Sequence, residues 1–408
     1  MIINSIKIIS VVGARPNFMK IAPFIKAIEE FNSKSSDIYI DHTLVHTGQH
    51  YDEKMSGSFF KELQIDQPDV NLEIGSGTHA EQVGNTMIAF EKVLKNLKPH
   101  WVVVVGDVNA TCACSITTKK EGIRLAHIEA GLRSYDIAMP EEINRLVTDR
   151  LSDLLLTPDS ISSNNLQDEG VDERKIKLVG NIMIDTLETN ITEAKKLSTE
   201  SVVKSSMLAE QQIPESVMNG SQFGLVTMHR PSNVDNPKVL REIVTFLAEE
   251  ATSKLDLIWP IHPRTKNIIA KIGLLEDILK NPKLLLTEPL GYLQMLKLNM
   301  SADIMLTDSG GLQEECCVLG TPCLTMRWNT ERPITLKEHG GASVLVGNSV
   351  SNIRREFLRC IAQDRKPKRP KLWDGNTAKR IVNCIVSEHL QTEEVCFEFE
   401  EESKFKAV

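Results

Sequence analysis

The chain has 408 residues, which is too long for one ordinary hydrophobic core and predicts two domains of about 200 residues each. A hydrophobic content of 41% and a charged content of 25% are typical of a globular protein, and the net charge of −8 argues against a nucleic-acid partner. No apolar run approaches the roughly 20 residues that a membrane span needs, so we expect no membrane partner either.

The N-terminal residues are interpreted as a buried strand rather than an export signal, because Asn4 and Lys7 interrupt the apolar run and no cleavage pattern comes after it. The eight cysteines lack the CxxC spacing of zinc sites, so we expect them to be reduced and buried. These features predict a cytoplasmic protein without a bound metal.

The first half of the chain alternates predicted strands with predicted helices, a pattern that favours parallel βαβ units. The predicted strands span residues 6–13, 41–47, 101–106, 124–129, 153–157 and 177–180. The predicted helices span residues 18–31, 80–97, 111–121, 141–151 and 161–169.

A polar, weakly patterned stretch over 192–222 is interpreted as an interdomain segment, after which a second alternation begins. Its strands are predicted over 224–228, 257–261, 283–287, 303–307, 322–326 and 343–347, each followed by a helix. An amphipathic segment over 376–390 precedes an acidic tail that we expect to be partly disordered.

The fold class predicted from this pattern is α/β, with two Rossmann-like domains facing a cleft. The N-terminal domain is expected to comprise residues 1–190 together with a returning helix over 374–392, and the C-terminal domain residues 191–373. Residues 393–408 form the acidic tail. No cofactor is predicted: residues 75–80 match a loose dinucleotide pattern only after a weak strand, and no GxxxxGK[ST] phosphate loop exists.

Candidate chemistry in the first half lies where predicted strands end. Arg15 and Lys20 flank the first turn and could reach an anion there, although a solvated basic pair is the alternative. Asp107 follows a strand and could be either a helix N-cap or a catalytic acid. Glu129 ends a strand that should be buried on both faces, where a carboxylate needs a partner or a raised pKa, and His127 and Arg133 are possible partners.

Glu141 lies in a predicted first helical turn after Pro140, a position that acids occupy for the helix dipole alone. Arg145, four residues later, could form a simple helical ion pair with it. Judged alone, this segment favours the structural interpretation.

The second half offers several groups suited to an anion. His229 and Arg230 follow one predicted strand and His262 follows another, so both sites could hold a diphosphate. Ser309, Gly310 and Gly311 form a tight turn before a helix, where free backbone N–H groups favour phosphate. Glu315 could accept ribose hydroxyls, and Arg332 could be a further cation or a surface residue.

Eight motifs occur in order along most of the chain. They are Gly13-Ala14-Arg15-Pro16 with Lys20, Gly48-Gln49-His50, Gly106-Asp107, His127-Ile128-Glu129-Ala130-Gly131-Leu132-Arg133, Pro140-Glu141-Glu142-Ile143-Asn144-Arg145, His229-Arg230, Asp308-Ser309-Gly310-Gly311-Leu312-Gln313-Glu314-Glu315 and Thr330-Glu331-Arg332-Pro333. Each motif is weak alone, but the eight in this order are specific, and together they resemble the non-hydrolysing UDP-N-acetylglucosamine 2-epimerases.

The resemblance implies a glycosyltransferase-B fold and interconversion of UDP-GlcNAc and UDP-ManNAc in a homodimer. It implies catalytic roles for Asp107, Glu129, Glu141 and His229. It also implies substrate binding by the remaining candidates, which are Arg15, Lys20, Arg133, Arg230, His262, Ser309, Gly310, Gly311, Glu315 and Arg332.

The expected chemistry is anti elimination of UDP to a 2-acetamidoglucal, followed by re-addition with the proton on the other face. The proton on sugar carbon 2 can leave only if negative charge leaves with UDP. The reaction therefore demands a base for the proton, cations on the departing diphosphate and a closed site. The same chemistry on a UDP-diacetamido-uronic acid is a close alternative. Hydrolysis to free ManNAc, glycosyl transfer and a catalytically silent UDP-sugar sensor are less favoured.

Two departures from the family pattern concern binding. The interval between Glu129 and Glu141 is shorter than expected, so the loop over 134–139 is predicted to shape the sugar pocket differently. Bacterial members of the family are activated by their own substrate at a second site, to which Gln49 and His50 could contribute. An arginine-bearing segment expected near residues 75–78 is replaced here by Gly-Ser-Gly-Thr, which puts that activation in question.

Overall fold

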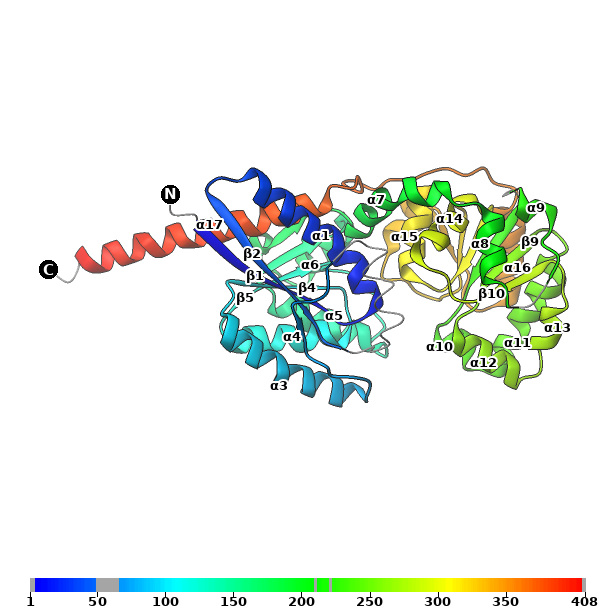
Figure 1. Cartoon of the computed structure of the whole chain (residues 1–408), viewed down its shortest axis with the longest axis horizontal. Coiled ribbons are helices and arrows are strands. Elements are labelled where there is room, and N and C mark those ends of the chain that lie inside the picture. Colours follow the sequence, from blue (N-terminus) through cyan, green and yellow to red (C-terminus); the bar gives the residue numbers. More distant parts are fainter. Residues whose placement is uncertain (1–3, 49–65, 209–210, 220–221, 406–408) are drawn as a thin grey trace. The chain divides into compact units, whose positions relative to one another are not determined.

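The computed structural model describes residues 4–48, 66–208, 211–219 and 222–405, without the side chains of Arg15, Pro16 and residues 392–405. The chain divides into two compact units, of which unit 1 comprises Met1–Thr186 with Lys371–Val408 and unit 2 comprises Leu187–Pro370. Unit 2 is therefore inserted into unit 1 along the chain (Figure 1). Within the described ranges, no helix is long and apolar enough to cross a membrane.

Unit 1 contains a parallel sheet with the strand order β3-β2-β1-β4-β5-β6-β7. The strands are β1 (Asn4–Val12), β2 (Ile38–His46), β3 (Val70–Asn71), β4 (Trp101–Val105), β5 (Arg124–Ile128), β6 (Leu154–Thr157) and β7 (Ile176–Leu178). The helices are α1 (Arg15–Lys34), α3 (His79–Leu97), α4 (Asn109–Lys120), α5 (Pro140–Leu151), α6 (Ser160–Asp168), α7 (Ile182–Lys196), which continues into unit 2, and α17 (Thr377–Phe405).

Strand β4 shows why this sheet is covered on both faces. Successive side chains of a strand point to opposite faces, and Val103 and Val105 belong to one apolar cluster whereas Val102 and Val104 belong to another. The first cluster includes residues of α1 and α17, which lie side by side (Figure 1), and the second includes residues of α3 and α4. The C-terminal helix therefore completes the core of unit 1.

Unit 2 repeats the arrangement with the strand order β10-β9-β8-β11-β12-β13, again with all pairs parallel. The strands are β8 (Phe223–Thr227), β9 (Asp256–Pro260), β10 (Leu284–Thr287), β11 (Ile304–Thr307), β12 (Cys323–Thr325) and β13 (Ser343–Leu345). The α-helices are α8 (Thr199–Ser206), α9 (Glu215–Met218), α10 (Pro231–Val234), α11 (Pro237–Thr245), α12 (Pro263–Lys271), α13 (Leu275–Leu279), α14 (Tyr292–Ser301), α15 (Gly310–Leu319) and α16 (Val350–Cys360).

The interpretation of residues 192–222 as an interdomain segment is wrong, because they belong to unit 2 and contribute to its core. Helices α8 and α9 lie there, and Val202, Val203 and Val217 are buried in the same apolar cluster as Leu225 of β8. These few valines are too sparse to produce a recognisable helical periodicity in the sequence. They are nevertheless enough to pack two short helices against the sheet.

The acidic tail also differs from the expected partial disorder, because α17 continues to Phe405. The segment contains neither glycine nor proline and is rich in glutamate, a good helix former. Extending a helix that is already nucleated costs far less than starting one, so the docked first half of α17 favours a helical conformation in its second half.

Candidate active site

The carboxyl ends of the parallel strands in each unit form one edge, and the candidate residues gather at these two edges. In unit 1, Asn17 connects the turn after β1 to the end of β4. Its side-chain amide donates to the carbonyl of Val105 at 2.9 Å, and its oxygen accepts from the backbone N–H groups of Gly13 and Ala14. The first turn is thereby held beside Gly106 and Asp107.

Glu129 is the most unusual residue at this edge. It is 3% exposed and has φ +71, in the left-handed region that costs an ordinary residue about 1 kcal/mol or more. Its Oε2 atom accepts a hydrogen bond from Nζ of Lys20, which is also buried, while its Oε1 atom has no hydrogen-bond partner among the described residues. One oxygen of the carboxylate thus pairs with Lys20, and the other is buried without a hydrogen-bond partner among the described residues.

The expected partners of Glu129 were His127 and Arg133, and the structure shows both paired elsewhere. Nδ1 of His127 lies 2.6 Å from Oδ1 of Asp149, and Nη1 of Arg133 donates to the other oxygen at 2.7 Å. Arg133 also makes a forked contact with Glu169 at 2.7 Å. These contacts use the guanidinium of Arg133 to support the turn after β5.

Asp149 remains charged within this buried network. Burial alone would raise its pKa, but the nearby His127 and Arg133 more than compensate and hold the pKa of Asp149 below its ordinary value. Nε2 of His127 lies 2.8 Å from the carbonyl oxygen of Gly106, which can only accept. Both ring nitrogens of His127 therefore face acceptor oxygens, which fixes the orientation of the ring.

Asp107 is held by Arg145 of α5. Nη1 of Arg145 lies 2.5 Å from Oδ2 of Asp107, and its Nη2 lies 2.5 Å from Oε2 of Glu142. Glu142 in turn accepts from the backbone N–H groups of Ser134 and Tyr135 at 3.0 and 2.9 Å. Burial would raise the pKa of Glu142, but these hydrogen bonds and Arg145 lower it overall. Glu142 therefore anchors the start of the loop over 134–139.

This arrangement replaces the helical Glu141–Arg145 pair that the sequence suggested, since Arg145 meets Asp107 and Glu142. Glu141 is half-buried in the first turn of α5. Asp107 and Glu129 follow the neighbouring strands β4 and β5, and a Cβ atom added at Gly106 would lie 3.3 Å from Nζ of Lys20 and 3.7 Å from Oε2 of Glu129. The structure thus brings Asp107, Lys20 and Glu129 together around Gly106.

Unit 2 has its own centre, Asp308, at the end of β11. This fully buried carboxylate accepts from the backbone N–H groups of His229 and Arg230 at 2.9 and 2.8 Å and from the side-chain amide of Asn233 at 3.0 Å. Nδ1 of His229 lies 2.9 Å from it. Burial would raise the pKa of Asp308, but His229 and the backbone donors lower it overall. One carboxylate therefore connects the turn after β8 with the turn after β11.

His262 lies beside His229, with ring centroids 5.8 Å apart. Its Nδ1 accepts the backbone N–H of Arg264 at 3.1 Å and so caps α12, while Arg264 pairs with Asp235 at 2.5 Å. Burial, then repulsion by His229 and Arg264, lowers the pKa of His262. His262 is thus a neutral helix cap whose other nitrogen remains a donor.

Gly310 and Gly311 begin α15 directly after Ser309, as the sequence predicts. Arg332 is buried against this turn, where its Nε atom donates to Glu314 at 2.7 Å and its Nη1 atom pairs with Glu331. A Cβ atom on Gly310 would lie 2.5 Å from Nη1 of Arg332, so any larger residue there would force the buried guanidinium to shift. Arg332 therefore supports the turn through its contacts with Glu314 and Glu331.

Glu315 is buried one residue further along α15. Burial raises its pKa to about 7, although hydrogen bonds from Asn299 and Tyr292 act in the opposite direction. Its Oε2 atom lies 3.5 Å from the side-chain amide of Asn299. Its expected role toward ribose remains a prediction.

Three sequence candidates cannot be placed, because Gln49, His50 and the side chain of Arg15 lie outside the described residues. Four supporting residues were not predicted from the sequence: Asn17, Glu142, Asp149 and Asp308. Of these, Asp308 carried a usable signal, since an acid between a buried strand and a Ser-Gly-Gly turn cannot remain unpaired. No group of acids, histidines and cysteines in the described ranges could hold a metal.

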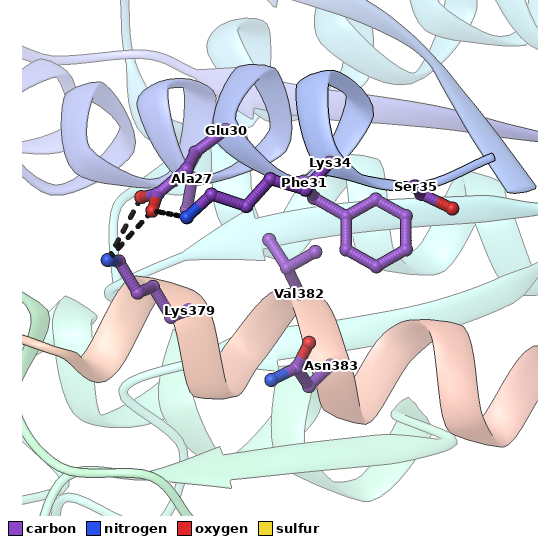
Figure 2. Close-up of a pocket in the computed structure, with 8 residues that line it drawn as sticks. All are labelled: Ala27, Glu30, Phe31, Lys34, Ser35, Lys379, Val382 and Asn383. Carbon is purple, nitrogen blue, oxygen red and sulfur yellow. Dashed lines mark hydrogen bonds and ion pairs between the residues drawn. The ribbon is translucent and has the colours of Figure 1, made fainter.

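A pocket of about 360 Å³ lies elsewhere, between the C-terminal half of α1 and the start of α17 (Figure 2). Glu30 bridges Lys34 and Lys379 at its rim, at 2.5 and 3.0 Å. Helix α1 begins at the carboxyl end of β1, so its C-terminal half lies toward the opposite edge of the sheet. The pocket is therefore separate from the candidate residues of unit 1.

Known proteins resemble this chain over most of its length. The family model described as UDP-N-acetylglucosamine 2-epimerase matches residues 33–386. The chain is 41% identical over 381 residues to the UDP-N-acetylglucosamine 2-epimerase of Methanocaldococcus jannaschii, covering 93% of this chain and 98% of that protein. It is 38% identical over 347 residues to the UDP-2,3-diacetamido-2,3-dideoxy-D-glucuronate 2-epimerase of Pseudomonas aeruginosa, covering 84% and 88%.

A solved structure of the M. jannaschii UDP-GlcNAc 2-epimerase in complex with UDP-GlcNAc and UDP is similar to this chain with a TM-score of 0.82 and 40% identity. The match covers 94% of this chain and 100% of that one. The expected fold class is confirmed: two α/β units of the glycosyltransferase-B type, each built on a parallel sheet.

Proposed function

Because the chain belongs to the UDP-N-acetylglucosamine 2-epimerase family, whose members are isomerases, we propose that it interconverts UDP-GlcNAc and UDP-ManNAc at sugar carbon 2. The observation that carries this proposal is the buried carboxylate of Glu129, which is paired with Lys20 on one oxygen and has no hydrogen-bond partner on the other among the described residues. A buried carboxylate with a free oxygen beside Asp107 suits the abstraction of an unactivated proton.

In the proposed elimination, a carboxylate of unit 1 takes the proton from carbon 2 as the C1–O bond breaks. The C–H electron pair forms the C1–C2 double bond of a 2-acetamidoglucal, and the C1–O pair departs with UDP. Re-addition reverses these steps, with the proton delivered to the opposite face of carbon 2. Asp107, Glu129 and Glu141 are the proposed acids and bases.

Unit 2 is proposed to hold the leaving group. The N–H groups at the start of α15, after Ser309, favour an anion, and His229 and Arg230 are proposed to stabilise the diphosphate together with Arg15 and Lys20 of unit 1. We propose that residues 1–190 and 374–392 act on the sugar and that residues 191–373 bind UDP, with Glu315 near the ribose. A homodimer and an activator site at Gln49 and His50 are part of the same proposal.

The test is incubation with UDP-GlcNAc in heavy water. Elimination predicts UDP-ManNAc that carries deuterium at sugar carbon 2, because the abstracted proton exchanges with solvent. Formation of the epimer without deuterium would contradict the elimination route, and absence of UDP-ManNAc would contradict the assigned substrate.

A second candidate substrate, a UDP-diacetamido-uronic acid, is favoured by the likeness to the P. aeruginosa relative. The chemistry at carbon 2 would be unchanged, so only the substituents of the sugar differ. A panel of UDP sugars, compared by kcat/KM, separates the two candidates.

A further inference from the structure

Trp328 differs from the other tryptophans of this chain. The chain has four, and Trp101, Trp259 and Trp373 are at most 2% exposed whereas Trp328 is 66% exposed. A single exposed apolar side chain is ordinary on a protein surface. The unusual feature of Trp328 is that its ring is nevertheless held in one orientation.

Two contacts hold the ring. Nε1 of Trp328 donates to the side-chain oxygen of Asn348 at 3.1 Å. Gly347, with φ +62, lies against the ring, and a Cβ atom added there would come within 2.7 Å of three ring atoms. One face of the indole therefore rests on the backbone of Gly347, and the opposite face is the exposed one.

The ring lies at the candidate edge of unit 2. Trp328 follows β12 and Gly347 follows β13, and both strands run parallel to β11, which ends just before Asp308. The amide of Asn348 also donates to the carbonyl of Ser232 in α10 at 3.1 Å. Asn348 thus links the indole to the helix that directly follows His229 and Arg230.

We propose that Trp328 stacks its open face against a ring of the bound nucleotide sugar and so helps to select the substrate. This inference rests on the proposed function. The ligand chemistry is a ring with an apolar face, which both the uracil and the hexose of a UDP sugar present. A preorganised indole loses little conformational freedom on binding, so the contact adds to affinity.

The first test is acrylamide quenching of tryptophan fluorescence in the full chain. Because the other three indoles are buried, the quenchable emission should come from Trp328, and W328F, which removes this indole, should abolish it. We expect UDP-GlcNAc to protect Trp328 from quenching. Protection by UDP alone would assign the contact to the uracil, and protection only by UDP-GlcNAc would assign it to the hexose.

The second test separates contact from indirect shielding. W328A should raise KM for UDP-GlcNAc about tenfold, the factor that corresponds to 1.4 kcal/mol, with little change in kcat. W328F keeps an aromatic face and should recover most of that loss. L358A, which removes another exposed apolar side chain of unit 2 from α16, is the matched control and should behave as the unmodified chain.

An unchanged KM in W328A, or quenching that neither UDP nor UDP-GlcNAc reduces, would overturn the inference. The quenching assay reads binding alone. If the chain binds and protects Trp328 but forms no epimer, the proposed reaction fails while the contact stands.

Discussion

Nδ1 of His229 lies 2.9 Å from the buried carboxylate of Asp308, which also accepts the backbone N–H groups of His229 and Arg230. Asp308 itself is fully buried and faces no solvent, so its action on a ligand must pass through the groups that it positions. It fixes which nitrogen of His229 is turned inward and leaves Nε2 available to an anion.

We expect D308N to lower kcat at least about tenfold, because an amide nitrogen would face backbone donors and the oriented histidine would lose its carboxylate. The measurement is the pH dependence of kcat, together with the UDP dissociation constant from calorimetry. E250Q, which removes an exposed ion pair of the same unit, is the control. A D308N variant with unaltered kcat and pH profile would show that His229 needs no such support.

For Glu129, we expect E129Q to lower kcat about 10²- to 10⁴-fold, since an amide cannot accept the proton. The change should also destabilise unit 1, because Lys20 would remain buried without its carboxylate. Adding K20M should restore the melting temperature without restoring turnover. Normal turnover in either variant would remove Glu129 from the catalytic step.

Adjacent glycines offer a sharp test of the anion-binding turn. Apart from its chain neighbours and the backbone of its own helix, no described residue comes within 4 Å of a Cβ built on Gly311, so G311A should fold with unreduced stability. If a diphosphate approaches the start of α15, the added methyl group should nevertheless weaken UDP binding about tenfold or more. G310A, whose Cβ would meet Arg332 at 2.5 Å, should lose stability as well as affinity. Unchanged UDP affinity in G311A would place the phosphate elsewhere.

Glu315 predicts a pH dependence of stability in unit 2. Its pKa is raised by burial to about 7 in the folded chain from an ordinary value of 4.5, so between these pH values the folded state binds more protons than the unfolded state. The free energy of unfolding is therefore highest below pH 4.5, where this carboxyl is protonated in both states. It falls by roughly 3 kcal/mol as the pH rises to 7. Calorimetric melting of E315Q against the unmodified chain should show this slope removed. Parallel profiles for the two proteins would contradict a buried, protonated Glu315.

The fold could be predicted to a large extent because its signals are local. Runs such as residues 101–105 are apolar throughout, as strands buried on both faces must be, and the helices between them show their own period. Helices α8 and α9 were missed because their few buried valines gain meaning only from the sheet on which they pack.

The candidate site could be predicted residue by residue but not in its pairings. Lys20 and Glu129 are separated by 109 positions, and Asp107 and Arg145 by 38, so no sequence spacing indicates their contact. Local spacing instead suggested Glu141 as the ion-pair partner of Arg145. It suggested residues close in sequence as the partners of Glu129. Reactive residues that follow a strand can be recognised in the sequence. Their hydrogen-bond and ion-pair partners depend on which strands and helices the fold brings together.

The division of unit 1 into two stretches of chain has a consequence for biosynthesis. Its core contains Ile381 and Ile385, which leave the ribosome after all of unit 2. Unit 2 can complete its own sheet while synthesis continues, whereas the face of α1 that receives α17 stays uncovered until the end. A chain truncated before residue 377 would contain all of unit 2 but would leave an apolar surface of unit 1 exposed, which makes unit 1 the part at risk of aggregation.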